Sequence, residues 1–164
     1  MKSKNLNQSL TFVLALLILS GCVKNETREL TAEEHAFVGT WQYIVEEKNE
    51  SQLDVEYMQL IIHESGLVSY EYCFVQKFQS SQGAKRSSKS INLPDAVLIE
   101  LTPTQLVLEQ SLEFIHFEYE LELNRSPYQE AGRWYMDVEQ LKLQKLSATE
   151  VAALVDWVCP NNEE

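Results

Sequence analysis

The stretch from residue 113 to residue 123 shows the clearest alternation of apolar and polar side chains, and it restricts the fold more than any other feature of the chain. The apolar positions are Ile115, Phe117, Tyr119, Leu121 and Leu123, and the polar positions are His116, Glu118, Glu120 and Glu122. Successive side chains of a β-strand point to opposite faces, so one face of this strand contacts a core and the other contacts water. The pattern predicts a sheet that is buried on one side.

Similar patterns predict an all-β chain with eight strands. The expected strands cover residues 40–48, 53–63, 67–78, 96–102, 105–110, 113–123, 133–138 and 141–146. Short turns such as 64–66, 103–104 and 139–140 join them, which favours antiparallel pairing of neighbours. An antiparallel meander leaves two exposed edges, and pairing the first strand with the last removes both. The sequence therefore predicts a closed eight-stranded barrel.

Helices are expected only at the two ends of this domain. Thr31-Ala32-Glu33-Glu34 and Ser147-Ala148-Thr149-Glu150 have the spacing of capping boxes. The first predicts a short helical turn before Gly39, and the second predicts a helix through Val158 that docks on the outside of the sheet. Residues 79–92 are rich in serine and predict a mobile loop, and residues 124–132 predict turns.

The N-terminal residues resemble the signal peptide of a bacterial lipoprotein. Lys2 and Lys4 precede an apolar run at 10–19 that is too short to span a bilayer, and Leu19-Ser20-Gly21-Cys22 is similar to a lipobox. The resemblance implies cleavage before Cys22 and acylation of that residue. Residues 1–21 are then the signal peptide, 22–30 a polar tether and 31–164 the folded domain. The alternative is an ordinary secretory signal with an incidental cysteine.

The same resemblance implies a location in the cell envelope. Residue 23 is valine rather than aspartate, and in a Gram-negative host the sorting habit of lipoproteins would then place the protein on the outer membrane, facing the periplasm. The acyl chains would hold it there stably because two or three chains bind a bilayer far better than one.

The order of parts resembles the lipocalin-like superfamily over residues 31–159. Gly39-Thr40-Trp41 enters the first strand after a helical turn, eight strands follow, and a helix comes last. The resemblance implies that Trp41 closes one end of the barrel, against an arginine such as Arg133. The sequence departs from the family in lacking its second motif and in its long serine-rich segment.

An eight-stranded barrel either fills its interior or keeps a pocket for one small ligand. The expected ligand-binding residues are Trp41, Tyr43, Tyr70, Tyr72, Phe74, Phe117 and Tyr119. Lys85 and Arg86, with Lys89, would close over the mouth and pair with a carboxylate or phosphate of an apolar ligand. The alternatives are an ordinary aromatic core and a solvated loop.

Charge suggests a second function class. The chain has 13 basic and 25 acidic residues, and loss of Lys2 and Lys4 with the signal leaves a net charge of −14. Such a surface repels nucleic acid and favours a cationic partner, although solubility alone also explains it. The expected function is binding of a small apolar ligand; the alternative is an acidic protein-binding module, an immunity or inhibitor lipoprotein acting on a cationic toxin or lysozyme-like enzyme.

The cysteines and histidines predict a disulfide and no catalysis. With Cys22 acylated, Cys73 and Cys159 remain in an oxidising compartment, where they are expected to pair and close a loop of 87 residues. Two buried free thiols are the alternative. His35, His63 and His116 are scattered without metal-ligand spacing or a nucleophile, so no metal, cofactor or enzymatic activity is expected.

Overall fold

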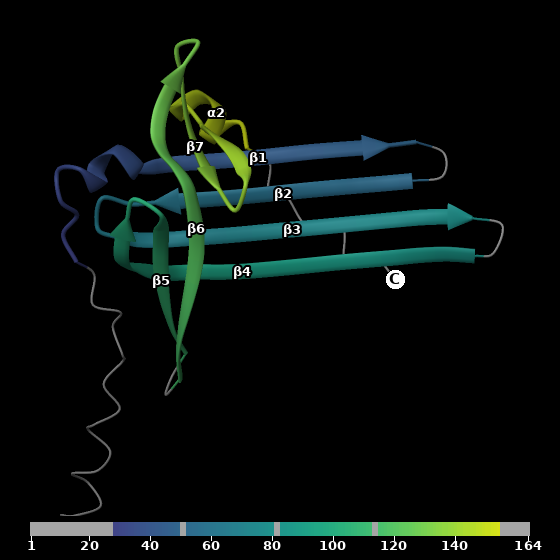
Figure 1. Ribbon diagram of the computed structural model, residues 1–164, viewed down its shortest axis with the longest axis horizontal. Coiled ribbons are helices and arrows are strands. Elements are labelled where there is room, and N and C mark those ends of the chain that lie inside the picture. Colours follow the sequence, from purple (N-terminus) through teal and green to yellow (C-terminus); the bar gives the residue numbers. More distant parts are fainter. Residues whose placement is uncertain (1–27, 50–51, 81–82, 113–114, 155–164) are drawn as a thin grey trace, which may run out of the picture.

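The computed structural model describes residues 28–49, 52–80, 83–112 and 115–154, which form eight antiparallel strands in one sheet (Figure 1). Neighbours in sequence are neighbours in the sheet, and pairing of β1 with β8 closes the barrel. The elements are η1 (Glu34–Phe37), β1 (Gly39–Lys48), β2 (Gln52–Ile62), β3 (Leu67–Ser80), β4 (Gly83–Thr102), β5 (Gln105–Leu112), β6 (Ile115–Glu130), β7 (Arg133–Val138), β8 (Leu141–Lys145) and α2 (Ala148–Ala152). The predicted all-β class and strand number are confirmed for these residues.

Side chains fill the interior of the barrel. Alternate residues of each strand point inward, and those that are at most 2% exposed are Trp41, Met58, Leu60, Ile62, Val68, Tyr70, Ala96, Leu98, Leu106, Leu108, Leu121, Leu123, Met136, Val138 and Leu143. Leucine and methionine dominate this set, and they pack without polar groups that would need partners. An eight-stranded barrel can either fill its interior with side chains or keep a ligand pocket there, and in this barrel side chains fill the interior.

Four strands continue beyond the barrel mouth. β1 pairs with β8 only at Trp41 and Gln42, and β4 pairs with β5 only from Val97 onward. Residues 43–48, 52–57, 72–80 and 83–92 therefore form a four-stranded sheet that we call the β1–β4 extension. In Figure 1 these strands run side by side as long ribbons, and β5 and β6 run across them.

The predicted mobile loop at residues 79–92 is wrong. The register pairs Phe78 with Lys85 and Lys77 with Arg86, so the segment is a regular hairpin of β3 and β4. Backbone pairing satisfies the polar main chain whatever the side chains are, and lysine is common on edge strands because it discourages aggregation. The described residues 83 and 85–90 are solvent-exposed, which removes the apolar alternation by which a strand is recognised.

The predicted turn region at residues 124–132 is also mostly strand. β6 continues to Glu130, and the turn itself is confined to Ala131 and Gly132, both with positive φ. Register shifts between Leu123 and Arg125 and between Arg125 and Tyr128 bend the strand. Such bulges accommodate polar and turn-forming residues without ending a strand.

The C-terminal helix is shorter than predicted. The Ser147 hydroxyl accepts from the Glu150 N–H at 3.3 Å and the Glu150 carboxylate accepts from the Ser147 N–H at 2.7 Å, so the capping box is confirmed. However, α2 ends at Ala152, and Val151 and Leu154 are 39% and 38% exposed. A helix of five residues makes little more than one turn and presents no continuous apolar face to dock on the sheet.

Trp41 closes one end of the barrel, but its cationic neighbour is not Arg133. The Trp41 indole N–H donates to the Phe37 carbonyl at 2.6 Å, and the Lys145 ammonium lies 5.2 Å from the ring centroid. Gly39 has a φ of 135°, a backbone conformation that residues with a side chain rarely adopt, which explains the glycine of the Gly39-x-Trp41 pattern. Arg133 instead lies 3.5 Å from Glu150, on the outside of the barrel.

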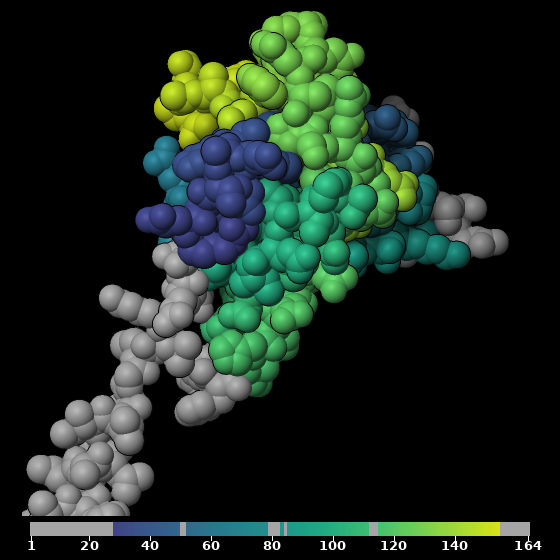
Figure 2. Space-filling view, turned by 60° about the vertical axis from the view of Figure 1, so that its left-hand side comes forward, coloured from purple at the N-terminus to yellow at the C-terminus, as the bar shows by residue number. Residues whose placement is uncertain are grey.

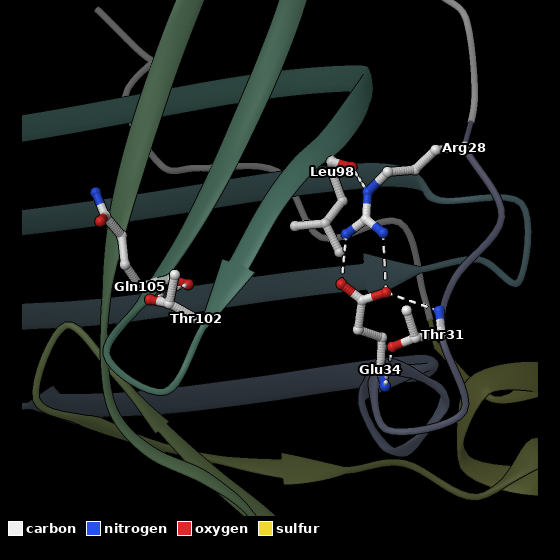
Figure 3. Close-up of polar contacts among 6 residues, drawn as sticks. All are labelled: Arg28, Thr31, Glu34, Leu98, Thr102 and Gln105. Atoms are coloured by element: carbon white, nitrogen blue, oxygen red, sulfur yellow. Dashed lines mark hydrogen bonds and ion pairs between the residues drawn. The ribbon is translucent and has the colours of Figure 1, made fainter.

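Residues 28–30, which the sequence predicts to be part of the tether, instead pack against the barrel. The Arg28 guanidinium donates to both oxygens of Glu34, at 2.8 and 2.5 Å, and to the Leu98 carbonyl at 2.9 Å (Figure 3). Leu30 is buried in the core. Gly66 has a φ of 78°, and a Cβ there would lie 2.9 Å from the Arg28 carbonyl oxygen.

Glu34 joins this contact to the first capping box. Its carboxylate accepts from the Thr31 N–H at 2.7 Å, and its own N–H donates to the Thr31 hydroxyl at 3.4 Å. Figure 2 shows the purple N-terminal segment packed against the teal and green strands. The capping box is therefore confirmed, and together with the Arg28 contacts it fixes residues 28–34 to the barrel.

We expect the Arg28–Glu34 contact to make the free energy of unfolding depend on pH in the acidic range. Hydrogen bonds from Arg28 lower the pKa of Glu34 to about 2. Because the folded-state pKa is below that of the unfolded chain, this stabilisation is complete above about pH 4.5 and is lost as the pH falls toward 2. Partial exposure of Arg28 screens the pair, so Glu34→Gln should cost about 1 to 2 kcal/mol at neutral pH.

Urea unfolding at several pH values checks this expectation. The difference between wild type and Glu34→Gln should shrink to near zero by pH 2, whereas Glu33→Gln, at an exposed neighbouring position, should match wild type throughout. A constant difference at all pH values would mean that the ionised carboxylate is not what stabilises this contact.

Several predictions fall outside the described residues. They concern the signal peptide at 1–21, acylation of Cys22, and Cys159 as the partner of Cys73. Within the described part of the chain, no helix is long and apolar enough to cross a membrane.

Candidate functional site

A small pocket lies at the barrel mouth, where the interior meets the β1–β4 extension. Its volume is about 120 Å³. The residues that line it come from five strands and the β7–β8 turn, and they are Glu56, Met58, Tyr70, Tyr72, Lys89, Tyr119, Glu139 and Leu141. Most of these side chains end in a hydroxyl or a charge, so the pocket wall is mainly polar.

The tyrosines are held by contacts with one another and with charged neighbours. The Tyr72 hydroxyl donates to the Glu56 carboxylate at 3.1 Å, and the Lys89 ammonium lies 5.5 Å from the Tyr72 ring centroid. The rings of Tyr70 and Tyr119 are tilted with centroids 5.6 Å apart. Glu139 has a φ of 51° in the β7–β8 turn, and its carboxylate accepts from the Glu122 N–H at 2.7 Å.

Burial determines the ionisation of this cluster. It raises the pKa of Tyr70 and Tyr119, and together with the Glu56 charge it raises the pKa of Tyr72 to about 12. The phenols therefore stay protonated at neutral pH and act as hydrogen-bond donors. Such a pocket suits a water molecule or a small acceptor group.

The structure brings together three of the predicted ligand-binding residues. Tyr70, Tyr72 and Tyr119 line the pocket. Trp41 lies in the interior with no exposed surface, and Tyr43 is half-buried beside the core. These two positions support the core alternative for the inward aromatic residues.

The other predicted ligand-binding residues are not part of this pocket. Phe74 is half-buried on the extension, and Phe117 is 48% exposed where the β5–β6 hairpin projects beyond the barrel. Lys85 and Arg86 are exposed on β4 and do not line the pocket, because the hairpin holds them several residues further along the extension. Lys89, nearer the barrel, is the member of that basic cluster that reaches it.

Sequence reasoning missed the two carboxylates of the pocket. Glu56 occupies the same face of β2 as the buried Met58 and Leu60, so the alternation of that strand was a usable signal. Glu139 belongs to the β7–β8 turn, and the pairing of β6 with β7 brings it beside β6 and Tyr119. No local pattern carries that information.

A second candidate site is a row of carboxylates on the outer face of β4, β5 and β6, which we call the acidic face. Its members are Glu100, Glu109, Glu118, Glu120 and Glu122. Glu109 lies directly opposite Glu118, and Val107 lies opposite Glu120 with Glu100 on its other side. All except the half-buried Glu109 are exposed.

Little positive charge compensates this face. Glu109 lies 3.8 Å from His116, whose ring nitrogen also contacts the Ser111 hydroxyl at 2.8 Å. Among the described residues, no ion pair involves Glu100, Glu118, Glu120 or Glu122. Like charges opposite one another in a sheet destabilise it, so the domain carries an electrostatic cost that a cationic partner would relieve.

The projecting hairpin that carries part of the acidic face also exposes apolar side chains, which lie on its opposite face. The β5–β6 hairpin extends past the barrel wall at the lower end of Figure 2, and Ile115 and Phe117 near its tip are 57% and 48% exposed. Large exposed apolar residues beside charges are common at protein interfaces. This hairpin combines the two features.

Among the residues that the structure describes, no three of the histidine, cysteine and carboxylate side chains are placed to hold a metal ion. The three histidines are exposed. Comparisons with protein families, with curated proteins and with solved structures give no match to this chain.

Proposed function

We propose that the chain is a membrane-anchored lipoprotein whose β domain binds a cationic protein through the acidic face. The observation that carries this proposal is the row of five carboxylates with a single histidine nearby. The net charge of −14 expected for the mature chain acts in the same direction, because it attracts a basic partner over a longer range. An immunity or inhibitor lipoprotein acting on a cationic toxin or lysozyme-like enzyme has this chemistry.

The packed interior favours this function over binding of a small apolar ligand. Ligand pockets commonly have volumes of roughly 300 to 1,000 Å³ and mostly apolar walls. The pocket at the barrel mouth has about 120 Å³, and Glu56, Lys89 and Glu139 contribute to its wall. A fatty chain finds neither the space nor the surface it needs there.

The anchor is the second part of the proposal, and it rests on the lipobox resemblance of residues 19–22. Because residues 28–30 pack on the barrel, a chain acylated at Cys22 would have at most five residues, 23–27, between the lipid and the packed part of the domain. The six Cα–Cα steps from Cys22 to Arg28 span at most about 20 Å. The domain would then work close to the membrane surface. In this proposal the domain is a lipocalin-like barrel that is stabilised by a Cys73–Cys159 disulfide.

Replacing Cys22 tests the anchor. We expect Cys22→Ala to abolish acylation and cleavage, so the precursor should keep its signal peptide and lose metabolic labelling with palmitate. Labelling and gel mobility measure both effects. Cys73→Ala is the control, and it should be labelled and processed as the wild type is. Cleavage of Cys22→Ala at the same bond would instead indicate an ordinary secretory signal.

Salt dependence tests the binding proposal. A lysozyme serves as the cationic probe, and calorimetric titration of the mature domain measures the dissociation constant. We expect binding at low ionic strength and a dissociation constant that rises at least about tenfold on moving to physiological salt, because screening shortens the range of charge pairs. A fluorescent fatty acid is the control ligand and should not bind. Saturable binding of the fatty acid without binding of cationic proteins would favour the carrier function instead.

A further inference from the structure

Groups of opposite charge line the pocket at the barrel mouth from strands that lie side by side (Figure 1). Glu56 of β2 lies opposite Phe74 of β3, and Phe74 lies opposite Lys89 of β4. Residues directly opposite one another share a face of the sheet, so the three side chains form one row on the barrel side. The backbones of Glu56 and Lys89 are two strands apart, which is roughly 10 Å. The Phe74 side chain projects between the two charges.

The charged groups of this pocket do not neutralise one another. Among the residues that the structure describes, no ion pair involves Glu56, Lys89 or Glu139. The Glu56 carboxylate accepts a hydrogen bond from the Tyr72 hydroxyl, and the Glu139 carboxylate accepts one from the Glu122 N–H. A carboxylate can accept several hydrogen bonds, so each of the two keeps the capacity for a further donor.

Donors for an anionic group are present in the same pocket. Tyr70 and Tyr119 line it together with Lys89. Burial raises the pKa of both phenols, so they keep their protons at neutral pH. A protonated phenol and an ammonium both donate to a carboxylate. The pocket therefore offers acceptors for a cationic group and donors for an anionic group within one small space.

We propose that this pocket binds a small zwitterion, namely a free α-amino acid. The ligand's ammonium donates to Glu56 and Glu139, and its carboxylate accepts from Lys89 and from the Tyr119 hydroxyl. The volume of about 120 Å³ has room for a few water molecules, each of which takes about 30 Å³ in the liquid, and an amino acid the size of glycine or alanine replaces them. A ligand with a single charge satisfies only one of the two sets of groups.

This site is separate from the acidic face. Tyr119 points into the barrel mouth, whereas its neighbours Glu118 and Glu120 on β6 point to the outer wall. A protein that binds the acidic face therefore leaves the pocket open, and the inference goes beyond the proposed function. Glu118→Lys with Glu120→Lys should bind an amino acid as the wild type does, so failure of either proposal leaves the other testable.

Titration of the mature chain with glycine tests the site, with the tyrosine ring resonances followed by NMR. Because so small a ligand makes few contacts, we expect a dissociation constant on the order of 1 mM. Ethylammonium and acetate carry one charge each and should bind at least about tenfold more weakly. If ethylammonium or acetate binds as tightly as glycine, the second charge makes no contact and the proposal is overturned.

Glu56→Gln and Lys89→Met test the two halves of the site. Each should weaken glycine binding at least about tenfold, because each removes a charge that the zwitterion contacts. Glutamine keeps an oxygen that can accept from the Tyr72 hydroxyl. The matched control is Lys85→Met, which makes the same change of charge on the same face of β4 at an exposed position that does not line the pocket. Unchanged binding in Lys89→Met, or an equal loss in Lys85→Met, would overturn the proposal.

A lipid head group is another source of the same chemistry, since phosphatidylethanolamine carries a primary ammonium and a phosphate. Vesicles of phosphatidylethanolamine and phosphatidylcholine in equal parts serve as the competitor, and vesicles of phosphatidylcholine alone, whose quaternary ammonium has no N–H to donate, serve as the control. We expect neither to displace glycine, because a pocket of this volume fits a free amino acid better than a larger head group held in a bilayer. Displacement by the first vesicles alone would assign the pocket to the head group and overturn the free amino acid as its ligand.

Discussion

Trp41→Ala is expected to reduce the free energy of unfolding by about 3 to 5 kcal/mol, which is a large part of the stability of a domain of this size. Trp41 has no exposed surface, its indole N–H bonds the Phe37 carbonyl, and its ring packs beneath Lys145. Removing the indole leaves a cavity and an unsatisfied carbonyl where η1 meets the barrel. Urea unfolding followed by far-ultraviolet circular dichroism measures the loss.

The matched control is Trp134→Ala. Trp134 is on β7 and is 44% exposed, so the same truncation there removes much less buried surface and should cost about 1 kcal/mol or less. Trp41→Phe should lie between the two, because it keeps apolar volume but loses the donor to Phe37. Equal losses for Trp41→Ala and Trp134→Ala would show that Trp41 does not close the barrel end.

The strands that could be predicted from the sequence are those in which one face is exposed to solvent and the other is buried. In β6, Leu121 and Leu123 are buried and Glu120 and Glu122 are exposed. The apolar and polar residues of this strand therefore alternate in the sequence, and the strand can be recognised from that alternation. The hairpin of Lys85 with Phe78 has water on both faces, and its strands are defined by main-chain pairing. Pairing of that kind leaves no pattern of side chains to recognise.

The candidate sites show the same division between local and long-range information. The alternation of inward and outward positions along β3 and β6 correctly predicts that Tyr70 and Tyr119 face the same side of the sheet and meet at the barrel interior. It fails for Phe117, because a strand longer than the barrel wall carries its inward face into solvent. The cation beside Trp41 follows from the β1–β8 closure, which places Lys145 there, and no spacing within the chain favours Lys145 over Arg133.

Reversing two charges of the acidic face is expected to abolish most binding of a cationic protein. Glu118→Lys with Glu120→Lys removes two attractions and introduces two repulsions. A pair of unit charges at contact distance in water is worth about 1 kcal/mol, so the double variant should lose roughly 4 kcal/mol, or about a thousandfold in affinity. Calorimetric titration with the lysozyme probe at low ionic strength measures the change.

Folding and binding should respond in opposite directions, which makes this test specific. Glu109 lies directly opposite Glu118, so Glu118→Lys replaces a repulsive cross-strand pair with an attractive one and should leave stability unchanged or slightly raised. The control is Glu46→Lys with Glu47→Lys, which makes the same change of net charge at exposed positions of the β1–β4 extension. If both double variants weaken binding equally, the total charge of the domain attracts the partner, and the acidic face is not its docking site. The two double variants change the net charge by the same amount and differ only in where the changed charges lie. A loss of binding seen only for Glu118→Lys with Glu120→Lys would therefore place the partner against β6.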